Sequence, residues 1–411
     1  MRNRIPKEKR LGVAILAIAL AALLVLTACA PRPIVEGKTV QFGWMQPLTG
    51  GGATTSQVLL MGWQDYVRYF NEQQAIPGVR TELLWRDTQL QAALGIGHYE
   101  MFVEAGMPLI VVGEPSARAA LKGRCEQDKV VGFLSGSPEY EDLYPEPGWY
   151  YANILPMFER AAVLLDYFME NWKEERPPRL AFMHVDHSVG YIVRYATGYA
   201  RDLGFEVLPP EVVPIVVLDS TIQLLRLKDA GADLVYIVHQ SEGAGVILRD
   251  AERLGLLDEF QFAGPSLLMG DRTIKLAGAA SEGFLATRSF PWFDETEVPG
   301  VKLIIDNMMK YHGQVTRDGE YFTAWTGAAI VCEAMRRATE DVGYENLDGP
   351  AIKEALDGMK DFDVYGLASI TYKPGDHRGN TKKAIYEVQG GEQVRVSDWR
   401  EAPSGRDWEF E

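Results

Sequence analysis

The feature that most constrains the fold of this chain is a regular alternation of short apolar runs with longer runs of helical periodicity. The short runs, typical of strands, cover residues 40–45, 82–85, 109–112, 130–134, 180–184, 234–238 and 260–263. The longer runs, typical of helices, cover residues 58–73, 92–104, 157–172, 191–203, 244–254, 301–312 and 321–340. Strands that alternate with helices indicate βαβ units and parallel sheets. We therefore predict an α/β fold.

Short polar or glycine-rich loops follow the strand-like runs. They read PLTGGGATTS, GEPSA, SGSPEYED, VDHSVG, HQSEGAG and GPSLLMGD. Because open parallel sheets bind ligands at the carboxyl ends of their strands, we expect these loops to line a ligand site. Small and hydroxyl-bearing residues dominate them, and candidate catalytic groups are few. The loops therefore predict recognition of a small polar ligand without catalysis.

The first loop, QPLTGGGATTSQ at residues 46–57, is typical of a cradle for an anion or a polar head group at a helix start. It lacks the Gly-Lys-Ser/Thr ending of a nucleotide-binding loop. No G-x-S-x-G elbow surrounds Ser116 or Ser137, so a serine hydrolase is not indicated. His184, Asp186 and His187 lie close in sequence but lack the further ligands of a zinc site. We predict no catalytic residue, no cofactor and no metal.

A change in composition divides the chain near residues 173–178, KEERPP, just before a second strand–loop–helix unit begins. This unit repeats the order of elements at the start of the chain, which predicts two lobes of similar architecture. After Asn380, two strand-like runs flank Gly390-Gly391, which predicts a hairpin.

The N-terminus has the pattern of an export signal. Five basic residues precede an apolar run at residues 11–26, which is short for a membrane span and typical of a signal peptide. The sequence Leu-Thr-Ala-Cys that ends at Cys29 resembles a bacterial lipobox, which implies that Cys29 carries a lipid. We predict a lipoprotein signal peptide at residues 1–28, a tether at residues 29–37 and an extracytoplasmic, membrane-anchored protein.

Charge and cysteine content narrow the class of partner. The chain carries a net charge of −16, and residues 1–28 hold five basic residues and one acidic residue, so the remainder carries −20. An acidic surface argues against nucleic-acid binding. Cys125 and Cys332 lie in helix-like runs, and their distance in sequence leaves open whether they form a disulfide.

The order of these motifs resembles that of type I periplasmic binding proteins, in particular the branched-chain-amino-acid-type solute-binding lipoproteins of ABC transporters. The resemblance spans the lipobox, PLTG, DTQ, VVGEPSA, ADLVYIVHQSEGAGVILRDAERLGL, FAGPS, ASEGFLAT and EYFTAWTGAAIVCEAMRRA. It implies two doubly wound Rossmann-like lobes joined by three crossovers near residues 151–155, 289–292 and 367–371. Lobe 1 would hold residues 38–152 and 291–367, and lobe 2 residues 153–290 and 368–411.

The resemblance also implies a function and partners. A monomeric receptor would bind a small solute in the cleft, close about a hinge and present the closed shape to an ABC permease and its ATPase. The alternative is a ligand sensor of the same fold that acts in signalling. An extracytoplasmic enzyme on the same pair of lobes is a further alternative, opposed by the absence of a catalytic constellation.

The family's binding positions fall on residues of several loops. The resemblance implies that Ser116 with Ala117, and Ser137 with Pro138, contact a ligand carboxylate. Other candidates at the ends of strands are Thr54, Thr55, Val189, Tyr191, His239, Gln240 and Ser266. Thr55 stands where the family often has an aromatic residue, and Val189 where a tyrosine is usual.

Ser266 is the most informative departure, because the family carries there the acidic residue that pairs with the ammonium of an amino acid. An ammonium without such a partner is strongly disfavoured in a buried site. We therefore expect a small polar or carboxylate-bearing solute, such as an amide, a urea-like compound or an organic acid. An amino acid would require a substitute carboxylate from another loop, for which the candidates are Glu114, Glu139, Asp186 and Glu242.

Overall fold

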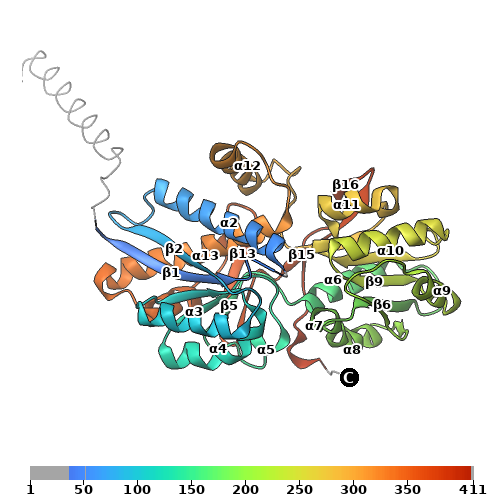
Figure 1. Ribbon diagram of the computed structural model, residues 1–411, viewed down its shortest axis with the longest axis horizontal. Coiled ribbons are helices and arrows are strands. Elements are labelled where there is room, and N and C mark those ends of the chain that lie inside the picture. Colours follow the sequence, from blue (N-terminus) through green and yellow to red (C-terminus); the bar gives the residue numbers. More distant parts are fainter. Residues whose placement is uncertain (1–36, 51, 409–411) are drawn as a thin grey trace, which may run out of the picture.

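The computed structural model describes residues 37–50 and 52–408. Two α/β lobes lie side by side, each built on its own sheet (Figure 1). The predicted signal peptide, Cys29 and the predicted tether up to residue 36 lie outside the described residues. Among the described residues, no helix is long and apolar enough to cross a membrane.

The first sheet has five parallel strands in the order β2-β1-β3-β4-β5. They are β1 (Thr39–Gln46), β2 (Arg80–Asp87), β3 (Leu109–Val112), β4 (Val131–Leu134) and β5 (Tyr150–Ala152). Because β2 and β3 lie on opposite sides of β1, the strand order reverses between β1 and β3. Open sheets bind ligands beyond the strand ends at such a switch point. The loops after β1 and β3 therefore lie at the edge where a ligand is expected.

The second sheet has nine strands, seven of them in the order β16-β15-β11-β10-β9-β6-β7. Its parallel part comprises β6 (Arg179–Val185), β7 (Glu206–Val207), β8 (Glu211–Val213), β9 (Leu234–Val238), β10 (Gln261–Pro265) and β11 (Leu285–Arg288). Its antiparallel part comprises β15 (Lys382–Gln389), β16 (Glu392–Arg395) and β17 (Arg400–Glu401). The last strands of the chain thus complete the second lobe.

The helices divide between the two lobes (Figure 1). The first lobe carries α2 (Ala53–Glu72), α3 (Ala92–Glu104), α4 (Pro115–Asp128), α5 (Tyr140–Leu143), α12 (Pro299–His312), α13 (Gly319–Val342) and α14 (Gly349–Asp357). The second carries α6 (Met157–Asn171), α7 (Ser188–Tyr191), α8 (Arg194–Asp202), α9 (Thr221–Asp229), α10 (Ser241–Arg253) and α11 (Asp271–Ala277). The 3-10 turns are η1 (Ser266–Met269), η2 (Gly278–Ser281), η3 (Tyr344–Asn346) and η4 (Gly405–Asp407).

A small third sheet lies beside the first. It consists of β12 (Phe362–Asp363), β13 (Ser369–Lys373) and β14 (Asp376–Gly379), all antiparallel. The Tyr372 hydroxyl donates to the Ala152 carbonyl at 2.8 Å, which ties β13 to the end of β5. Asn380, which follows β14, donates to the Ser289 carbonyl at 2.8 Å, and both residues are buried. Two segments that run between the lobes are therefore joined directly.

The predicted α/β class, the seven predicted strands and the hairpin at Gly390-Gly391 are confirmed. Two helix predictions were wrong at their ends. The first helix begins at Ala53 rather than at residue 58, because Gly52 takes up the left-handed conformation (φ 80°) that lets the chain turn into the helix early. The helix predicted at residues 191–203 begins later, at Arg194 as α8, and residue 191 instead ends the short helix α7. The limits of the lobes remain a prediction.

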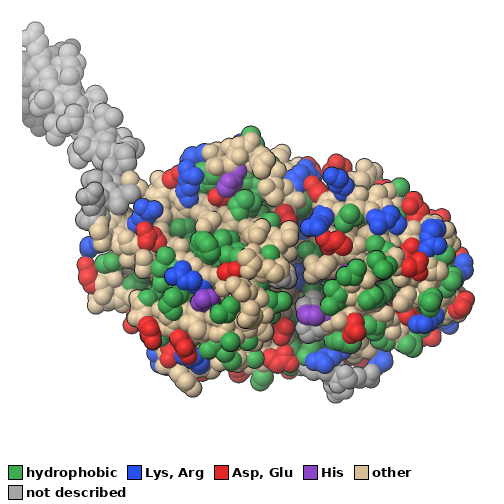
Figure 2. Space-filling model, viewed as in Figure 1, with side chains coloured by type: hydrophobic (Ala, Val, Ile, Leu, Met, Phe, Trp, Pro, Cys, Tyr) green, Lys and Arg blue, Asp and Glu red, His purple; other side chains and the backbone are tan. Residues whose placement is uncertain are grey.

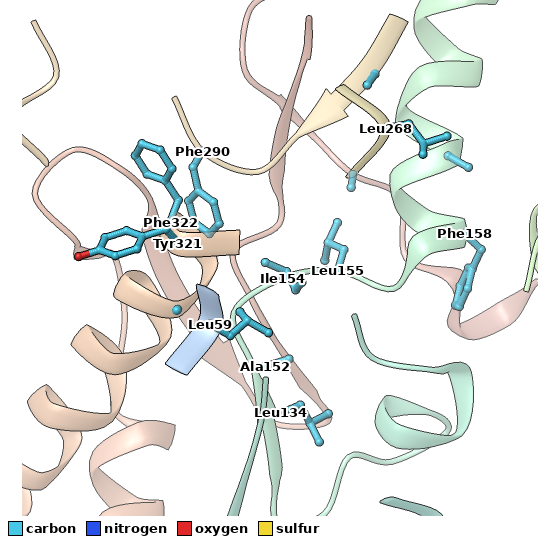
Figure 3. Packing of buried hydrophobic residues seen from close by; sticks show 14 of the residues in the cluster. Leu59, Leu134, Ala152, Ile154, Leu155, Phe158, Leu268, Phe290, Tyr321 and Phe322 are labelled. Atoms are coloured by element: carbon cyan, nitrogen blue, oxygen red, sulfur yellow. The ribbon is translucent and has the colours of Figure 1, made fainter. Parts of the chain in front are cut away.

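Buried apolar side chains connect the lobes where the chain passes from β5 into α6. Ile154 and Leu155, on this passage, are 4% and 0% exposed. Figure 3 shows them between the aromatic group of Phe290, Tyr321 and Phe322 on one side and Leu268 on the other. The passage from β5 to α6 is thus surrounded by apolar side chains. A polar group buried beside it needs a hydrogen-bond partner.

Candidate functional site

The opening loop is held in place by an internal carboxylate. Leu48 N and Thr49 N donate to Asp87 Oδ1 at 2.7 and 3.3 Å, and the Thr49 hydroxyl donates to Oδ2 at 2.6 Å. Burial opposes the ionisation of Asp87, but the Thr49 hydroxyl and the backbone N–H groups of Gln89, Leu48 and Thr49 lower its pKa overall. Backbone donors that the sequence suggested for a ligand anion are therefore already in use. Thr54 is exposed and Thr55 half-buried in the first turn of α2.

The loop after β3 is built around another carboxylate, Glu114, which is fully buried. Ser116 N and Oγ donate to its Oε1 at 3.1 and 2.5 Å, and the Thr88 hydroxyl donates to Oε2 at 2.5 Å. Ser116 is exposed at the start of α4, and the neighbouring Ala117 is buried. Both carboxylate oxygens of Glu114 thus accept hydrogen bonds from its own lobe.

The loop after β4 faces two arginines. Arg118 donates to the carbonyl oxygens of Ser135 and Ser137 at 2.9 and 2.8 Å and pairs with Asp142 at 3.3 Å. Arg160, at the start of α6, donates from Nη2 to the Ser137 hydroxyl at 2.9 Å. Ser137 is half-buried, and Pro138 after it is buried. Ser137 therefore lies at the contact between the first lobe and the first turn of α6.

The second-lobe candidates mostly have local partners. His239 is buried; its Nδ1 accepts from Gln240 N at 2.8 Å, which leaves Nε2 to donate to the Pro214 carbonyl at 3.1 Å. Gln240 itself is exposed. Tyr191 is also exposed, and its hydroxyl donates to Asp186 at 2.7 Å. The side chain of Val189 lies outside the described part of the chain.

The other carboxylates proposed as partners for a ligand ammonium also have contacts within the protein. Glu242 is exposed and pairs with Arg272 on the neighbouring helix. Glu139 takes part in the capping box of α5. With Asp186 bound to Tyr191 and Glu114 to its own loop, each of the four carboxylates proposed from the sequence has a structural partner.

A small cavity of about 20 Å³, partly open to solvent, lies between the lobes, beside the passage from β5 to α6. Figure 2 shows the lobes as two rounded masses that meet along a furrow. The cavity is lined by Ile154, Arg160, Ser266, Arg288, Ser289, Phe290, Gly319, Glu320 and Thr323. Of the predicted site residues, Ser266 lines the cavity. Ser137 does not line it, but its hydroxyl accepts a hydrogen bond from Arg160, which does.

Two arginines carry positive charge into this cavity. Arg160 and Arg288 are 6% and 4% exposed, and neither has a carboxylate within ion-pair distance among the described residues. Arg288 donates to Gln393 Oε1 at 2.6 Å and stacks 3.7 Å from the centre of the Trp292 ring. Burial lowers the pKa of both guanidinium groups, that of Arg288 to about 10, which is still well above neutral pH.

An acid faces them from the first lobe. Glu320 lies half-buried in the first turn of α13. Burial and the negative charge of Asp318 raise its pKa to about 7, against the opposing effect of Arg160 and Arg288. Gly319 permits this close approach, since a Cβ there would lie 3.0 Å from Arg288 Nη2. Charges from the two lobes therefore meet across one small cavity.

The profile of the family described as "Periplasmic binding protein" matches residues 39–393, most of the chain. The chain belongs to this family. Proteins of this family and fold are extracytoplasmic substrate-binding receptors that work with ABC permease and ATPase subunits, which agrees with the two lobes and the cavity between them.

Individual relatives of this periplasmic binding protein support the same assignment. It is 21% identical over 366 residues to the Leu/Ile/Val-binding protein homolog 7 of Brucella suis, covering 83% of this chain and 86% of the relative. A branched-chain amino acid ABC transporter protein of Thermus thermophilus, solved with bound valine, has a TM-score of 0.80 and 25% identity, over 89% of this chain and 97% of that one. A solute-binding protein of Rhodopseudomonas palustris, solved with 3,4-dihydroxybenzoic acid, has a TM-score of 0.73 and 18% identity, over 89% and 98%.

Three groups of this periplasmic binding protein's cavity were missed at the level of sequence: Arg160, Arg288 and Glu320. Each lies inside or at the edge of a helix or strand and not in one of the glycine-rich loops. Arg288 did carry a signal, because it is a charged residue close behind the apolar residues Phe284 to Ala286, at the carboxyl end of β11. The described cysteines, Cys125 and Cys332, are both buried and free.

Proposed function

We propose that this periplasmic binding protein is the solute receptor of an ABC importer and that it captures a small polar or carboxylate-bearing solute between its lobes. The single observation that carries the proposal is the cavity at the hinge. Its walls come from both lobes and from the passages between them, with Ile154, Ser289 and Phe290 on the passages. A solute held there would stabilise the closed arrangement of the lobes, which is the shape that a permease would recognise.

The ligands of two structural relatives support a small, carboxylate-bearing solute. Valine is bound in the Thermus thermophilus protein, and 3,4-dihydroxybenzoic acid in the Rhodopseudomonas palustris protein. Both compounds carry one carboxylate, and they differ in the rest of the molecule. Shared architecture with different ligands is expected when specificity resides in a few side chains of the site.

The proposal is tested by the solute that the protein retains. Chain produced from residue 30 onward, without the signal and the lipidated cysteine, would be purified and analysed by native mass spectrometry, and bound compounds would be identified after denaturation. We expect a small solute at a stoichiometry near one, and we expect its re-addition to make the protein more compact in small-angle X-ray scattering. A protein that neither carries nor responds to any small solute would contradict the proposal.

Transport, as opposed to signalling, is tested in the producing organism. Loss of the gene should abolish uptake of the radiolabelled solute, and a plasmid copy should restore it. Replacement of Cys29 by alanine should release the receptor into the soluble extracytoplasmic fraction. Normal uptake without the gene, together with a lost behavioural response, would favour the sensor.

A further inference from the structure

The charged side chains that line the cavity indicate which class of solute it binds. Resting on the receptor function proposed above, we infer that the ligand is a small organic acid without an ammonium group, and that Arg160 and Arg288 bind its carboxylate. Neither residue belongs to the loops from which binding residues were predicted. These two arginines differ from the other buried arginines of the described residues in the partners that they have.

Four arginines are buried among the described residues: Arg118, Arg160, Arg288 and Arg378. Arg118 pairs with Asp142 and also donates to three backbone carbonyls. Arg378 pairs with both Glu159 and Asp376. A buried guanidinium without an anion costs several kcal/mol, and these two residues show how the protein normally avoids that cost.

Arg160 and Arg288 break this pattern. In the part of the chain that the structure describes, neither has an ion pair, and the Nε–H of each lacks a hydrogen-bond acceptor. The Tyr236 hydroxyl, which is buried close enough to interact with the charge of Arg160, also has no partner there. Two cations that line one cavity without an anionic partner favour an anionic ligand there, and a carboxylate can offer an oxygen to each of them.

The cavity is a poor site for an ammonium group. Ser266 offers only a hydroxyl where a carboxylate would be needed, and the four substitute carboxylates have structural partners elsewhere. Glu320 is the acid that lines the cavity, and near neutral pH about half of it is protonated. A zwitterion would add no net charge, so the excess of positive charge on the cavity wall would remain.

Glu320 instead suits an organic acid as a hydrogen-bond donor. The charged groups that face it are Asp318 on its own helix and Arg160 and Arg288 from the second lobe. An anion bound between the arginines would favour the protonated form of Glu320, whose O–H could then donate to the ligand. Binding of the anion would therefore take up a proton, and its affinity would fall as the pH rises above about 7.

The inference is tested by titration calorimetry with acetate, benzoate, succinate, valine, leucine and acetamide. We expect at least one of the three acids to bind the wild type, and to bind more tightly than every neutral or zwitterionic compound. Arg160→Gln and Arg288→Gln should each weaken that binding about ten- to hundredfold. Arg272→Gln is the matched control, because Arg272 is an exposed second-lobe arginine. The affinity of this variant for the acid should equal that of the wild type.

Glu320→Gln separates the two kinds of ligand. We expect this variant to retain binding of the acid and to lose the decline in affinity above pH 7, whereas an ammonium ligand would lose its partner. If valine or leucine binds most tightly and Glu320→Gln abolishes that binding, the inference is wrong although the receptor function stands. If no acid binds the wild type, the inference also fails, and the retained solute then decides the receptor function separately. Melting temperatures of the arginine variants show whether they are folded, and the wild-type ranking does not depend on them.

Discussion

Glu159, on the first turns of α6, is a fully buried carboxylate whose loss should destabilise the protein strongly. Its Oε2 lies 3.1 Å from Arg378 Nη1 in β14, and its Oε1 accepts from Gly405 N at 2.7 Å and from the Tyr144 hydroxyl. Burial opposes the charge of Arg378, but hydrogen bonds to Asp376 and the charge of Glu159 raise the pKa of its guanidinium. One side chain thus joins four segments that are distant in sequence.

The expected magnitude follows from these contacts. Removal of one partner of a buried ion pair costs about 3–5 kcal/mol, because the other charge stays buried. Asp376 still compensates Arg378, with contacts of 2.8 and 2.9 Å, which favours the lower end of that range. The Gly405 N–H would be left unpaired, which adds about 1–3 kcal/mol. For Glu159→Ala we therefore expect a loss of about 4–6 kcal/mol in the free energy of unfolding, a large share of the roughly 5–15 kcal/mol of a typical domain.

The assay is urea unfolding at pH 7, followed by circular dichroism. Glu170→Ala is the matched control: Glu170 lies on the same helix and pairs with Arg400, but it is 58% exposed, and exposed pairs contribute about 0–1 kcal/mol. A double-mutant cycle with Arg378→Ala should give a coupling energy of about 1 kcal/mol or more. If Glu159→Ala costs no more than Glu170→Ala, or if the two alanine substitutions are simply additive, the reasoning about the buried pair is refuted.

Three further predictions concern proton-linked stability and packing. The pKa of Asp87 is lowered from 3.8, so its stabilising effect is present at neutral pH and is lost as the pH falls through the folded pKa. In urea unfolding, Asp87→Ala should therefore lower the free energy of unfolding by about 1 kcal/mol at pH 7 and by progressively less as the solution is made more acidic. The pKa of Glu320 is raised to about 7, so the free energy of unfolding of the wild type should fall by roughly 1–3 kcal/mol as the pH rises from about 4.5 to 7. Thermal melting curves should show this decline for the wild type and not for Glu320→Gln. Gly132→Ala should lower stability by about 1–3 kcal/mol, because its Cβ would lie 2.4 Å from the Tyr150 ring, whereas Gly123→Ala, where nothing lies within 4 Å, should not.

The strands of both lobes could be predicted because parallel strands covered on both faces are continuous apolar runs. β3 and β9, for example, are buried at every position and appear in the sequence as LIVV and LVYIV. The two-residue strands β7, β12 and β17 have no such signal, since their pairing depends on neighbours that are remote in sequence. The start of α2 was missed for a different reason. Its first five residues carry no apolar periodicity, and the backbone conformation of Gly52 decides where the helix begins.

The site could be predicted only in part, because a loop's composition does not show which of its groups are already occupied. Ser266 was predicted to bind the ligand; it lines the cavity, and its contact with a ligand remains a prediction. Whether Ser116 or Ser137 contacts a ligand remains a prediction, and their hydroxyls now have known protein partners, Glu114 and Arg160. The fate of a polar group is decided by contacts across the fold, and these do not appear in a local sequence pattern.

The opening loop illustrates how such contacts change the interpretation of an anion-binding pattern. Its free N–H groups suggested a cradle for a ligand, but Asp87 occupies Leu48 N and Thr49 N and so supplies the anion internally. The uncompensated positive charge lies instead at Arg160 and Arg288, on the side of the cavity formed by α6 and β11. A backbone cradle supplies only partial charges, whereas a buried guanidinium supplies a full one, so the arginines dominate the electrostatics of the site. We therefore expect the charge that selects the solute to come from Arg160 and Arg288 and not from the glycine-rich loop.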